Sequence, residues 1–260
     1  MSDSHVLSVE DLHFAYREDR PVLRGVNFSA RAGKFLTILG PNGSGKTTTL
    51  KCLLRLLRAT GGRIMLDGRE IGEYSSRELA KLTAYVPQQS QSAFALNVGQ
   101  LVMLGRTPHT GAMGFETDLD RRVVTAAMEM TRVDAFAERT LDELSGGEAQ
   151  CVMIARALAQ QPTMMLLDEP TSHLDVKNQL TIYRMMTRLA HDWGMAVVCV
   201  SHDVNLAGRF ADEMVLMKDG RVAADGPPPE VMTRDVMQEV YDVDVELVDS
   251  GGPVPLVVAY

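Results

Sequence analysis

Several features that would indicate secretion, membrane insertion or disulfide bonding are missing from this chain of 260 residues. No apolar run approaches the roughly 18 consecutive residues that a membrane-spanning helix requires. The opening residues MSDSHVLSVED contain no basic segment followed by an apolar one, so we expect no secretory signal. Cysteine occurs only three times and never as C-x-x-C, which favours free thiols in a reducing compartment.

An excess of basic residues is missing as well. The formal net charge is -8, which argues against nucleic acid as the main partner. The hydrophobic content of 45% and the charged content of 23% are typical of a globular protein with a sizeable core. The 16 methionines include pairs in apolar runs, which favours core filling over a methionine-rich metal or haem face.

The residue pattern predicts an α/β fold with an inserted helical block. Apolar and polar residues alternate over roughly the first 35 positions, which is typical of antiparallel strands. Short apolar segments at 34–40, 163–170 and 195–203 predict the buried strands of a parallel sheet. We expect one domain over 1–260, with a core of 1–92 and 161–260 and a helical subdomain at 93–160.

The segment GPNGSGKT at 40–47 matches the phosphate-binding pattern G-x-x-x-x-G-K-[ST] between a strand and a helix. Its glycines let the backbone N–H groups point at phosphate oxygens, at the positive end of the helix. We expect Lys46 to reach the β- and γ-phosphates and the Thr47 hydroxyl to hold Mg²⁺. Leucines at 50, 53, 54 and 57 predict that the following helix is amphipathic.

Polar residues also follow two other apolar strands, and ligands of parallel sheets bind at such strand ends. Asp168 is expected to hold Mg²⁺ through water, and Glu169 to polarise the attacking water as a general base. His202 follows the strand MAVVCV, where a neutral imidazole can donate to a γ-phosphate. A solvated acidic pair and a structural histidine are the alternatives, and the loop at 40–47 disfavours both.

Three further segments carry weaker signals on their own. Tyr16 could stack on a nucleotide base, although the pattern alone favours a half-buried strand tyrosine. Gln88, in YVPQQSQ, leaves the last strand before the helical block, where its amide could reach Mg²⁺ or water. In LSGGE at 144–148, Ser145 and Glu148 form a helix capping box, which does not explain the two glycines between them.

Taken in order, these residues resemble the ATP-binding subunits of ABC (ATP-binding cassette) transporters. The set is Tyr16, GPNGSGKTT, Gln88, LSGGE, LLDEP, SHLD and His202, and it covers nearly the whole chain. The resemblance implies a P-loop NTPase fold with a parallel-sheet core, an N-terminal antiparallel β layer and an inserted helical subdomain that ends in the signature helix. It also implies an ATPase coupled to transport, with ATP and Mg²⁺ as cofactors.

The resemblance assigns roles to the site residues. Glu169, His202 and Gln88 would be catalytic, and Gln88 would join Thr47 and Asp168 at Mg²⁺. In this family two subunits pair head to tail, so Ser145 and Gly147 would bind the γ-phosphate held by the partner. The expected nucleotide-binding residues are Tyr16, Gly40, Pro41, Asn42, Gly43, Ser44, Gly45, Lys46, Thr47, Thr48, Ser145, Gly146, Gly147 and Asp175.

A narrower resemblance concerns the transported substrate. The segments VMLGRTPHTG (102–111), TSHLD (171–175) and 201–233 are similar to those of importers of ferric siderophores, haem and cobalamin. This similarity implies a homodimer held at the cytoplasmic face of the membrane by permease subunits, with a substrate-binding protein as an indirect partner and no nucleic acid. The substrate itself is not expected to touch this subunit.

One residue departs from the family pattern. Cys151 stands where the family usually has arginine, three positions after the LSGGE glutamate. In a helix that starts at Glu148, Cys151 aligns with Ile154, Ala155 and Leu158, so we expect packing on the inner face. A reactive thiol is the alternative, and nothing in the neighbouring sequence indicates a lowered pKa.

Two other functions compete with transport. A soluble ABC ATPase in DNA repair or translation is the first, but such proteins resemble chains with two cassettes or a long coiled coil. This chain has one motif set and an acidic charge balance. The second, a nucleotide-binding module without hydrolysis, is disfavoured because both Glu169 and His202 are present.

Overall fold

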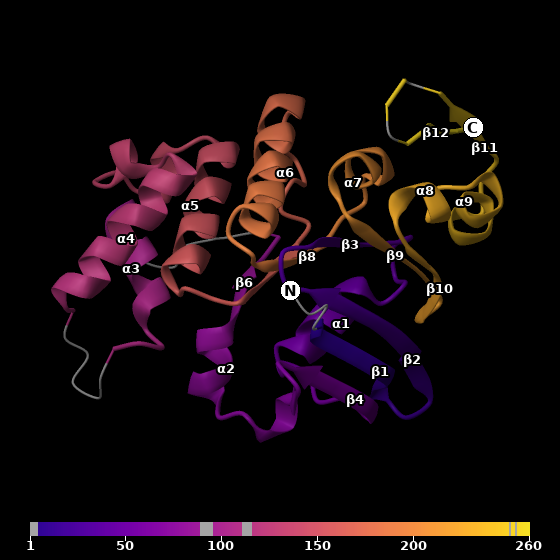
Figure 1. The fold of residues 1–260 in the computed structure, drawn as a ribbon, viewed down its shortest axis with the longest axis horizontal. Coiled ribbons are helices and arrows are strands. Elements are labelled where there is room, and N and C mark those ends of the chain that lie inside the picture. The colour runs from indigo at the N-terminus through magenta and orange to yellow at the C-terminus, as the bar shows by residue number, and fades with distance from the viewer. Residues whose placement is uncertain (1–4, 89–95, 111–115, 250, 253) are drawn as a thin grey trace. The chain divides into compact units, whose positions relative to one another are not determined.

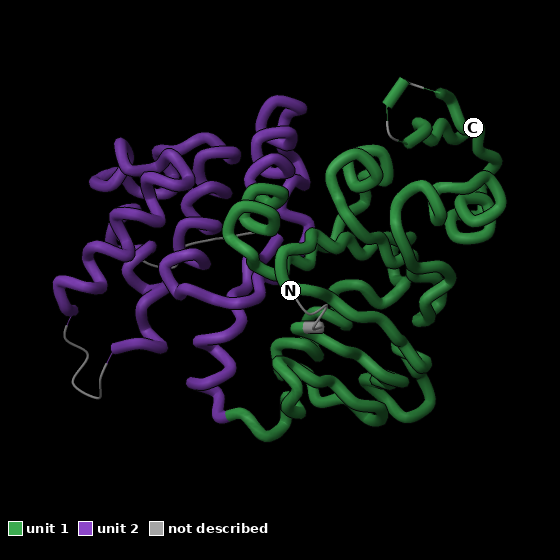
Figure 2. Tube along the Cα trace, viewed as in Figure 1, with its two compact units in different colours: residues 1–74, 186–260 green, residues 75–185 purple. Residues whose placement is uncertain are grey.

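The computed structural model describes residues 5–88, 96–110, 116–249, 251–252 and 254–260 (Figure 1). The chain divides into two compact units, one formed by residues 1–74 and 186–260 and the other by residues 75–185 (Figure 2). The helical subdomain expected at 93–160 falls within the second unit, although 93–95 lie outside the described residues. No described helix combines the length and the apolar character that membrane crossing needs.

An antiparallel sheet forms the N-terminal part of the first unit, as the alternating pattern predicts. Strand β1 (His5–Arg17) pairs with β2 (Arg20–Arg31) and with β4 (Gly61–Leu66), which in turn pairs with β5 (Arg69–Glu70). The turn between β4 and β5 is Asp67-Gly68, and both residues have positive φ angles, 47° and 75°. Asp-Gly suits this turn because both central positions need a left-handed backbone.

A second sheet in the first unit carries the strands that precede two predicted site segments. Strands β3 (Phe35–Leu39) and β8 (Ala196–Val200) are buried along their whole length and pair in parallel. Strand β3 also pairs in parallel with β9 (Glu213–Lys218), which continues through a hairpin into β10 (Arg221–Gly226). Burial on both faces is typical of parallel strands covered by helices, and it confirms the predicted parallel core.

The helix after the glycine loop is shorter than the leucine spacing predicts. Helix α1 (Lys46–Leu53) includes Leu50 and Leu53, but Leu54 and Leu57 lie beyond its end. Arg55 takes a left-handed backbone, with φ 54°, directly after the helix. A left-handed residue at this position ends a helix by directing N–H groups back onto its last carbonyls, and the N–H of Arg55 donates to the Cys52 carbonyl at 3.0 Å.

The C-terminal part of the first unit contains elements that the sequence analysis did not delimit. Helix α7 (Val204–Phe210) follows β8, and α8 (Pro228–Val231) and α9 (Arg234–Tyr241) follow β10. Strands β11 (Val245–Val248) and β12 (Leu256–Ala259) then form an antiparallel pair. One buried cluster holds these elements together, and its members include Ala207, Leu216, Met237, Val240 and Val245.

The second unit combines two parallel strands with a group of helices. Strands β6 (Thr83–Val86) and β7 (Met164–Asp168) pair in parallel, and β7 is fully buried. Helices α4 and α5 pack on each other, and α3 packs on both (Figure 1). The helices that begin in this unit are α2 (Ser76–Leu82), α3 (Val98–Met103), α4 (Asp118–Thr131), α5 (Gly146–Ala159) and α6 (Val176–His191).

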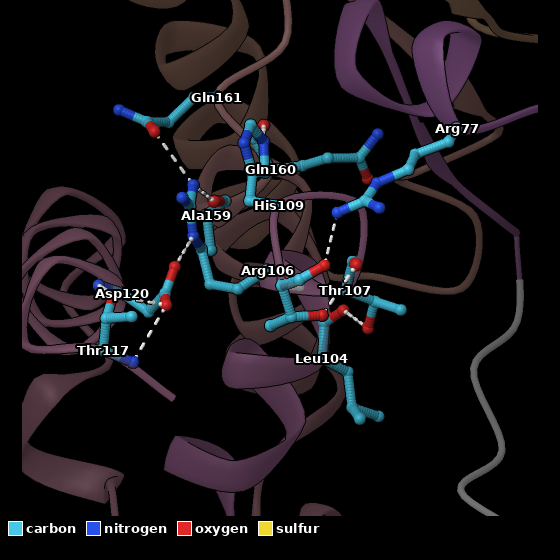
Figure 3. Close-up of polar contacts among 11 residues, drawn as sticks. Arg77, Leu104, Arg106, Thr107, His109, Thr117, Asp120, Ala159, Gln160 and Gln161 are labelled. Atoms are coloured by element: carbon cyan, nitrogen blue, oxygen red, sulfur yellow. Dashed lines mark hydrogen bonds and ion pairs between the residues drawn. The ribbon is translucent and has the colours of Figure 1, made fainter. Parts of the chain in front are cut away.

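A buried ion pair ties three parts of the helical block together (Figure 3). Arg106, only 2% exposed, donates through Nε to Asp120 Oδ1 at 2.8 Å. Its Nη1 donates to the Ala159 carbonyl and to Gln161 Oε1, both at 2.8 Å. Hydrogen bonds from Thr117, and then the Arg106 guanidinium, lower the pKa of Asp120 to about 2. The turn after α3, the start of α4 and the end of α5 are therefore joined by charge-assisted bonds.

Candidate nucleotide-binding site

The loop between β3 and α1 has a backbone shape that requires glycine. Gly40, Gly43 and Gly45 have φ angles of 145°, 81° and 105°. A Cβ atom on Gly40 would lie 2.1 Å from the carbonyl oxygen of Met217, and one on Gly45 would lie 2.7 Å from Leu23 Cδ2. The neighbouring strands therefore leave room for bare backbone only, which is what a loop that surrounds a phosphate needs.

Lys46 is folded over this loop. Its side chain is buried, and Nζ donates to the carbonyl oxygens of Gly40 at 2.8 Å and Pro41 at 3.0 Å. Both acceptors are neutral and belong to the loop itself. The ammonium group therefore lies at the loop where the sequence predicts phosphate, and an anionic oxygen would make a stronger acceptor than either carbonyl.

Two further features of the loop fit a bound phosphate. Helix α1 begins after Gly45, which offers no side-chain cap to the first N–H groups. The hydroxyl of Ser44 is buried, and its Oγ has no hydrogen-bond partner among the described residues. Uncapped N–H groups and a buried hydroxyl are suitable donors to phosphate oxygens. Thr47, in the first turn of α1, is half-buried, whereas Thr48 is buried.

The other two site residues of the first unit lie on its surface. Tyr16 is 61% exposed, and its ring meets the Phe14 ring edge-on, with centroids 4.8 Å apart. The half-buried alternative for Tyr16 is therefore wrong. The Tyr16 ring borders a hollow of about 540 Å³ that Pro21 and Thr60 also line, so a base could stack there.

His202 occupies a short connection between β8 and α7. The preceding residue, Ser201, donates its N–H to the Ile38 carbonyl of β3 at 3.1 Å. The following residue, Asp203, caps α7 by accepting the Leu206 N–H at 2.8 Å. His202 itself is exposed. Hydrogen bonds of Ser201 and Asp203 thus hold the chain on both sides of the exposed histidine.

In the second unit, the structure brings two predicted catalytic residues into contact. Gln88 Nε2 donates to Glu169 Oε2 at 2.7 Å. Glu169 also has a left-handed backbone, with φ 48°. For a residue other than glycine this conformation costs roughly 1–3 kcal/mol and is concentrated at functional sites. The carboxylate is therefore held in a defined place by its backbone and by the Gln88 amide.

Asp168 has a hydrogen-bond partner that the sequence pattern did not predict. The buried Asp168 carboxylate accepts a hydrogen bond from the Tyr85 hydroxyl at 3.3 Å. Burial, and then the charge of Asp168, raise the pKa of Tyr85 to about 12. Tyr85 lies in β6 opposite Leu166 of β7. The signal that could have found it is its place on a strand paired with the strand that Asp168 ends.

The signature segment forms the predicted capping box at the start of α5. Glu148 Oε2 accepts the Ser145 N–H at 2.8 Å and the Ser145 hydroxyl at 2.6 Å. The Glu148 N–H donates in return to Ser145 Oγ at 3.4 Å. The hydrogen bond from the Ser145 hydroxyl, and then the one from the Ser145 N–H, lower the pKa of Glu148. Ser145 and Gly146 are exposed, whereas Gly147 is buried.

A side chain of the same subunit explains why position 147 is glycine. A Cβ atom on Gly147 would lie 2.5 Å from Asn178 Cγ. Asn178 is in turn bonded to the predicted site residue Asp175, through its N–H at 2.8 Å and its Nδ2 at 3.1 Å. The sequence analysis did not single out Asn178. The close approach of this side chain explains the glycine without reference to a partner subunit.

Cys151 is less enclosed than the inner-face expectation implies. Ile154, Ala155 and Leu158 are buried, but Cys151 is only partly buried. Burial, and then the nearby charge of Glu148, raise the pKa of its thiol to about 11. A thiol with a raised pKa is a poor nucleophile at neutral pH, which supports packing over reactivity. An arginine at this position would have the Glu148 carboxylate as a neighbour.

Comparison with known proteins identifies the family. The family model described as "ABC transporter" matches residues 23–172, more than half of the chain. The chain is 41% identical over 242 residues to an iron(3+)-hydroxamate import ATP-binding protein of Bacillus subtilis, covering 93% of this chain and 90% of the relative. It is 42% identical over 228 residues to a hemin import ATP-binding protein of Streptomyces coelicolor, covering 88% and 80%.

A third relative and two solved structures agree. A cobalamin import ATP-binding protein of Halobacterium salinarum is 41% identical over 224 residues, covering 86% of this chain and 56% of the relative. An inward-facing metal-chelate type ABC transporter has a TM-score of 0.86 at 28% identity, covering 99% and 98%. A dimeric bacterial ABC transporter cassette has a TM-score of 0.75 at 30% identity, covering 85% and 98%. The chain therefore belongs to the ABC transporter family, as one of its ATP-binding, ATP-hydrolysing subunits.

Proposed function

We propose that this chain powers an importer of a ferric siderophore, haem or cobalamin. The observation that carries the catalytic part is Glu169, a strand-end carboxylate on a left-handed backbone that accepts a 2.7 Å bond from Gln88. The relatives named as import ATP-binding proteins, at about 40% identity over most of the chain, support the substrate class. No observation favours the DNA-repair or translation alternative.

In this proposal the first unit binds the triphosphate. Lys46 exchanges its two carbonyl acceptors for β- and γ-phosphate oxygens, and the loop N–H groups donate to the same oxygens. The remaining loop residues, Pro41 to Ser44, supply backbone, and Tyr16 stacks on the adenine. Thr47, Gln88 and Asp168 would hold Mg²⁺, which neutralises phosphate charge when it is bound.

Glu169 acts as the general base of the same reaction. The Glu169 carboxylate, oriented by the Gln88 amide, takes a proton from the attacking water. His202 donates to the γ-phosphate as negative charge develops there. Gln88 contacts Glu169 and would also contact Mg²⁺, so it can report the presence of nucleotide to the helical block.

The functional form in this proposal is a homodimer. Ser145 and Gly146 are the exposed part of the signature segment, and the first N–H groups of α5 would bind the γ-phosphate of the partner's ATP. Asp175 lies beside this helix start through Asn178. The dimer is held by permease subunits at the cytoplasmic face of the membrane and acts with a substrate-binding protein.

Replacing the base tests the catalytic assignment. Glu169→Gln keeps the side-chain volume but cannot accept the proton, so hydrolysis is expected to fall roughly 10²- to 10⁴-fold. ATP binding should persist, and the variant should accumulate as an ATP-bound dimer in size-exclusion chromatography. Glu116→Gln, at an exposed position, is the matched control. Normal turnover by Glu169→Gln would overturn the assignment.

Transport by the assembled complex tests the substrate class. The chain and its permease would be reconstituted in vesicles with a labelled ferric siderophore, haem or cobalamin. ATP-dependent accumulation of one of the three supports the proposal. Transport of none of them, with ATP hydrolysis intact, would refute the substrate class and leave the ATPase assignment standing.

A further inference from the structure

The C-terminal strand pair, β11 and β12, is hydrogen-bonded to α7, the helix that follows His202. Asn205, in the first turn of α7, donates through Nδ2 to the Val257 carbonyl of β12 at 3.1 Å. The Val257 N–H donates back to Asn205 Oδ1 at 2.8 Å. One side-chain amide thus bonds both backbone groups of one strand residue, and no motif of the sequence analysis accounts for this arrangement.

The two bonds use the side of β12 that faces away from β11. Val257 is opposite Leu247 in the antiparallel pair. Both of its backbone groups are bonded to Asn205, so this pair is of the type that exchanges no hydrogen bonds across the ladder. Asn205 therefore occupies the place of a neighbouring strand at an otherwise unpaired strand edge.

The same turn of α7 fixes the position of His202. Asp203 accepts the Leu206 N–H at 2.8 Å, and its own N–H donates to Ser201 Oγ at 3.1 Å. These bonds join residues 201–206 into one short segment that contains both His202 and Asn205. A shift of this turn would therefore carry the imidazole with it.

A cavity separates the His202 segment from the C-terminal elements. It has a volume of about 580 Å³, and its walls include His202 and Val204 on one side and Tyr241, Val245 and Val257 on the other. The open space leaves the turn of His202 room to move on that side. Ala207 of α7 belongs to the same buried cluster as Met237 and Val240 of α9. The Asn205 bonds to Val257 therefore lie between this apolar cluster and the cavity.

We propose that Asn205 is a positioning residue for His202, through which the C-terminal strand pair sets the place of the imidazole at the γ-phosphate. The inference rests on the proposed role of His202 in ATP hydrolysis and adds a control element to it. Strand β12 would then adjust the rate of hydrolysis without contacting nucleotide. A change in the strand pair would therefore alter kcat more than the affinity for ATP.

The bond can be broken from either side in the full-length protein. Asn205→Ala removes the amide, and Val257→Pro removes the donated N–H while the ladder to β11 keeps its own bonds. Each variant is expected to lower kcat roughly 3- to 30-fold, the range of couplings carried by residues that do not touch the ligand. The KM for ATP should change less than about 2-fold. The double variant should have about the same kcat as either single variant, because both substitutions break the same pair of bonds.

Asn205→Asp and Gln238→Ala serve as controls. Asn205→Asp keeps the acceptor for the Val257 N–H but places a carboxylate oxygen against the Val257 carbonyl, so its kcat should also fall below that of the wild type. Gln238→Ala removes a 3.0 Å bond to Asp244 within the C-terminal part and should leave kcat unchanged. If Val257→Pro does not fold, the two Asn205 variants still decide the question.

A variant without the imidazole distinguishes positioning of His202 from a general structural role of Asn205. In a His202→Ala background, Asn205→Ala should leave the residual kcat unchanged, because the group it positions is gone. An equal loss of kcat in both backgrounds, or wild-type kcat in Asn205→Ala, would overturn the proposal. Normal turnover by His202→Ala alone would refute both the proposed role of His202 and this inference. A low kcat in His202→Ala supports the role of His202 independently of the results for the Asn205 variants.

Discussion

Two buried cations in this molecule are bonded in opposite ways. Arg106 of the helical block donates to a carboxylate, a backbone carbonyl and a side-chain amide. Lys46 of the loop between β3 and α1, also buried at 5% exposure, donates to two neutral carbonyls of its own loop. Arg106 is paired with a buried carboxylate, whereas the Gly40 and Pro41 carbonyls that Lys46 contacts are uncharged.

The difference is the one expected between a structural cation and a cation that binds phosphate, the role proposed for Lys46. A buried charge paired with a carboxylate is costly to disrupt, because removing one partner leaves the other uncompensated. A buried ammonium bonded to neutral carbonyls can exchange them for phosphate oxygens at little cost and with a gain in charge-assisted bonding. The neutral carbonyl acceptors of Lys46 are therefore consistent with the phosphate-binding role proposed for it.

The largest effect is expected from breaking the ion pair of the helical block. Arg106→Met leaves the Asp120 carboxylate buried without its cation and should lower the free energy of unfolding by about 3–5 kcal/mol. Urea unfolding measures this change. Arg121→Met is the matched control, because its pair with Glu116 spans 3.9 Å at the surface and contributes less than about 1 kcal/mol. Equal losses in the two variants would contradict the comparison.

Removing the loop cation should give the converse result. Lys46→Ala loses charged hydrogen bonds to phosphate, each contributing about 1.5–3 kcal/mol, so the Kd for ATP should rise at least roughly 10- to 100-fold. Calorimetric titration with ATP measures this change. Without nucleotide, the variant should lose less stability than Arg106→Met does. Retained ATP affinity in Lys46→Ala would count against the role of the loop.

A smaller effect is expected from acid. The pKa of Asp120 is about 2 in the folded protein, below its ordinary value of 3.8. Its contribution to stability is therefore present above pH 4 and is lost as the pH falls from about 4 to about 2. In Asp120→Asn this part of the pH dependence of the unfolding free energy should be absent. An unchanged pH profile in that variant would assign the acid sensitivity to other carboxylates.

The strands and the nucleotide loop follow from the sequence because short-range rules determine them. Strand β3 reads as an apolar run, and Gly40 and Gly45 stand where backbone must approach other strands. Ser145 and Glu148 form their cap from residues three positions apart. The apolar run and the capping box depend on neighbours in the chain, and the two glycines belong to a short motif, although the strand residues that they approach are far away in the sequence.

Other features depend on residues far apart in the chain, and the sequence analysis did not foresee them. The pairs Tyr85–Asp168 and Asn205–Val257 are separated by 83 and 52 positions. The polar Arg106 lies in the helical block as a buried residue, although charged side chains are mostly exposed. Helix α1 ended early because of the backbone of Arg55, which the leucine spacing does not encode.

The contact between Gly147 and Asn178 affects how genetic variants of the signature segment should be interpreted. Any side chain introduced at Gly147 must displace Asn178, and with it the bonds to Asp175. A loss of activity in such a variant would therefore include damage inside its own subunit, in addition to any effect on the proposed contact with the partner's ATP. Gly146 is exposed, and its nearest neighbour would lie 3.4 Å from an added Cβ. A substitution at Gly146 leaves Asn178 and Asp175 in place. In a dimer of one variant and one wild-type subunit, it would therefore test the proposed contact with the partner's ATP separately from damage inside the variant subunit.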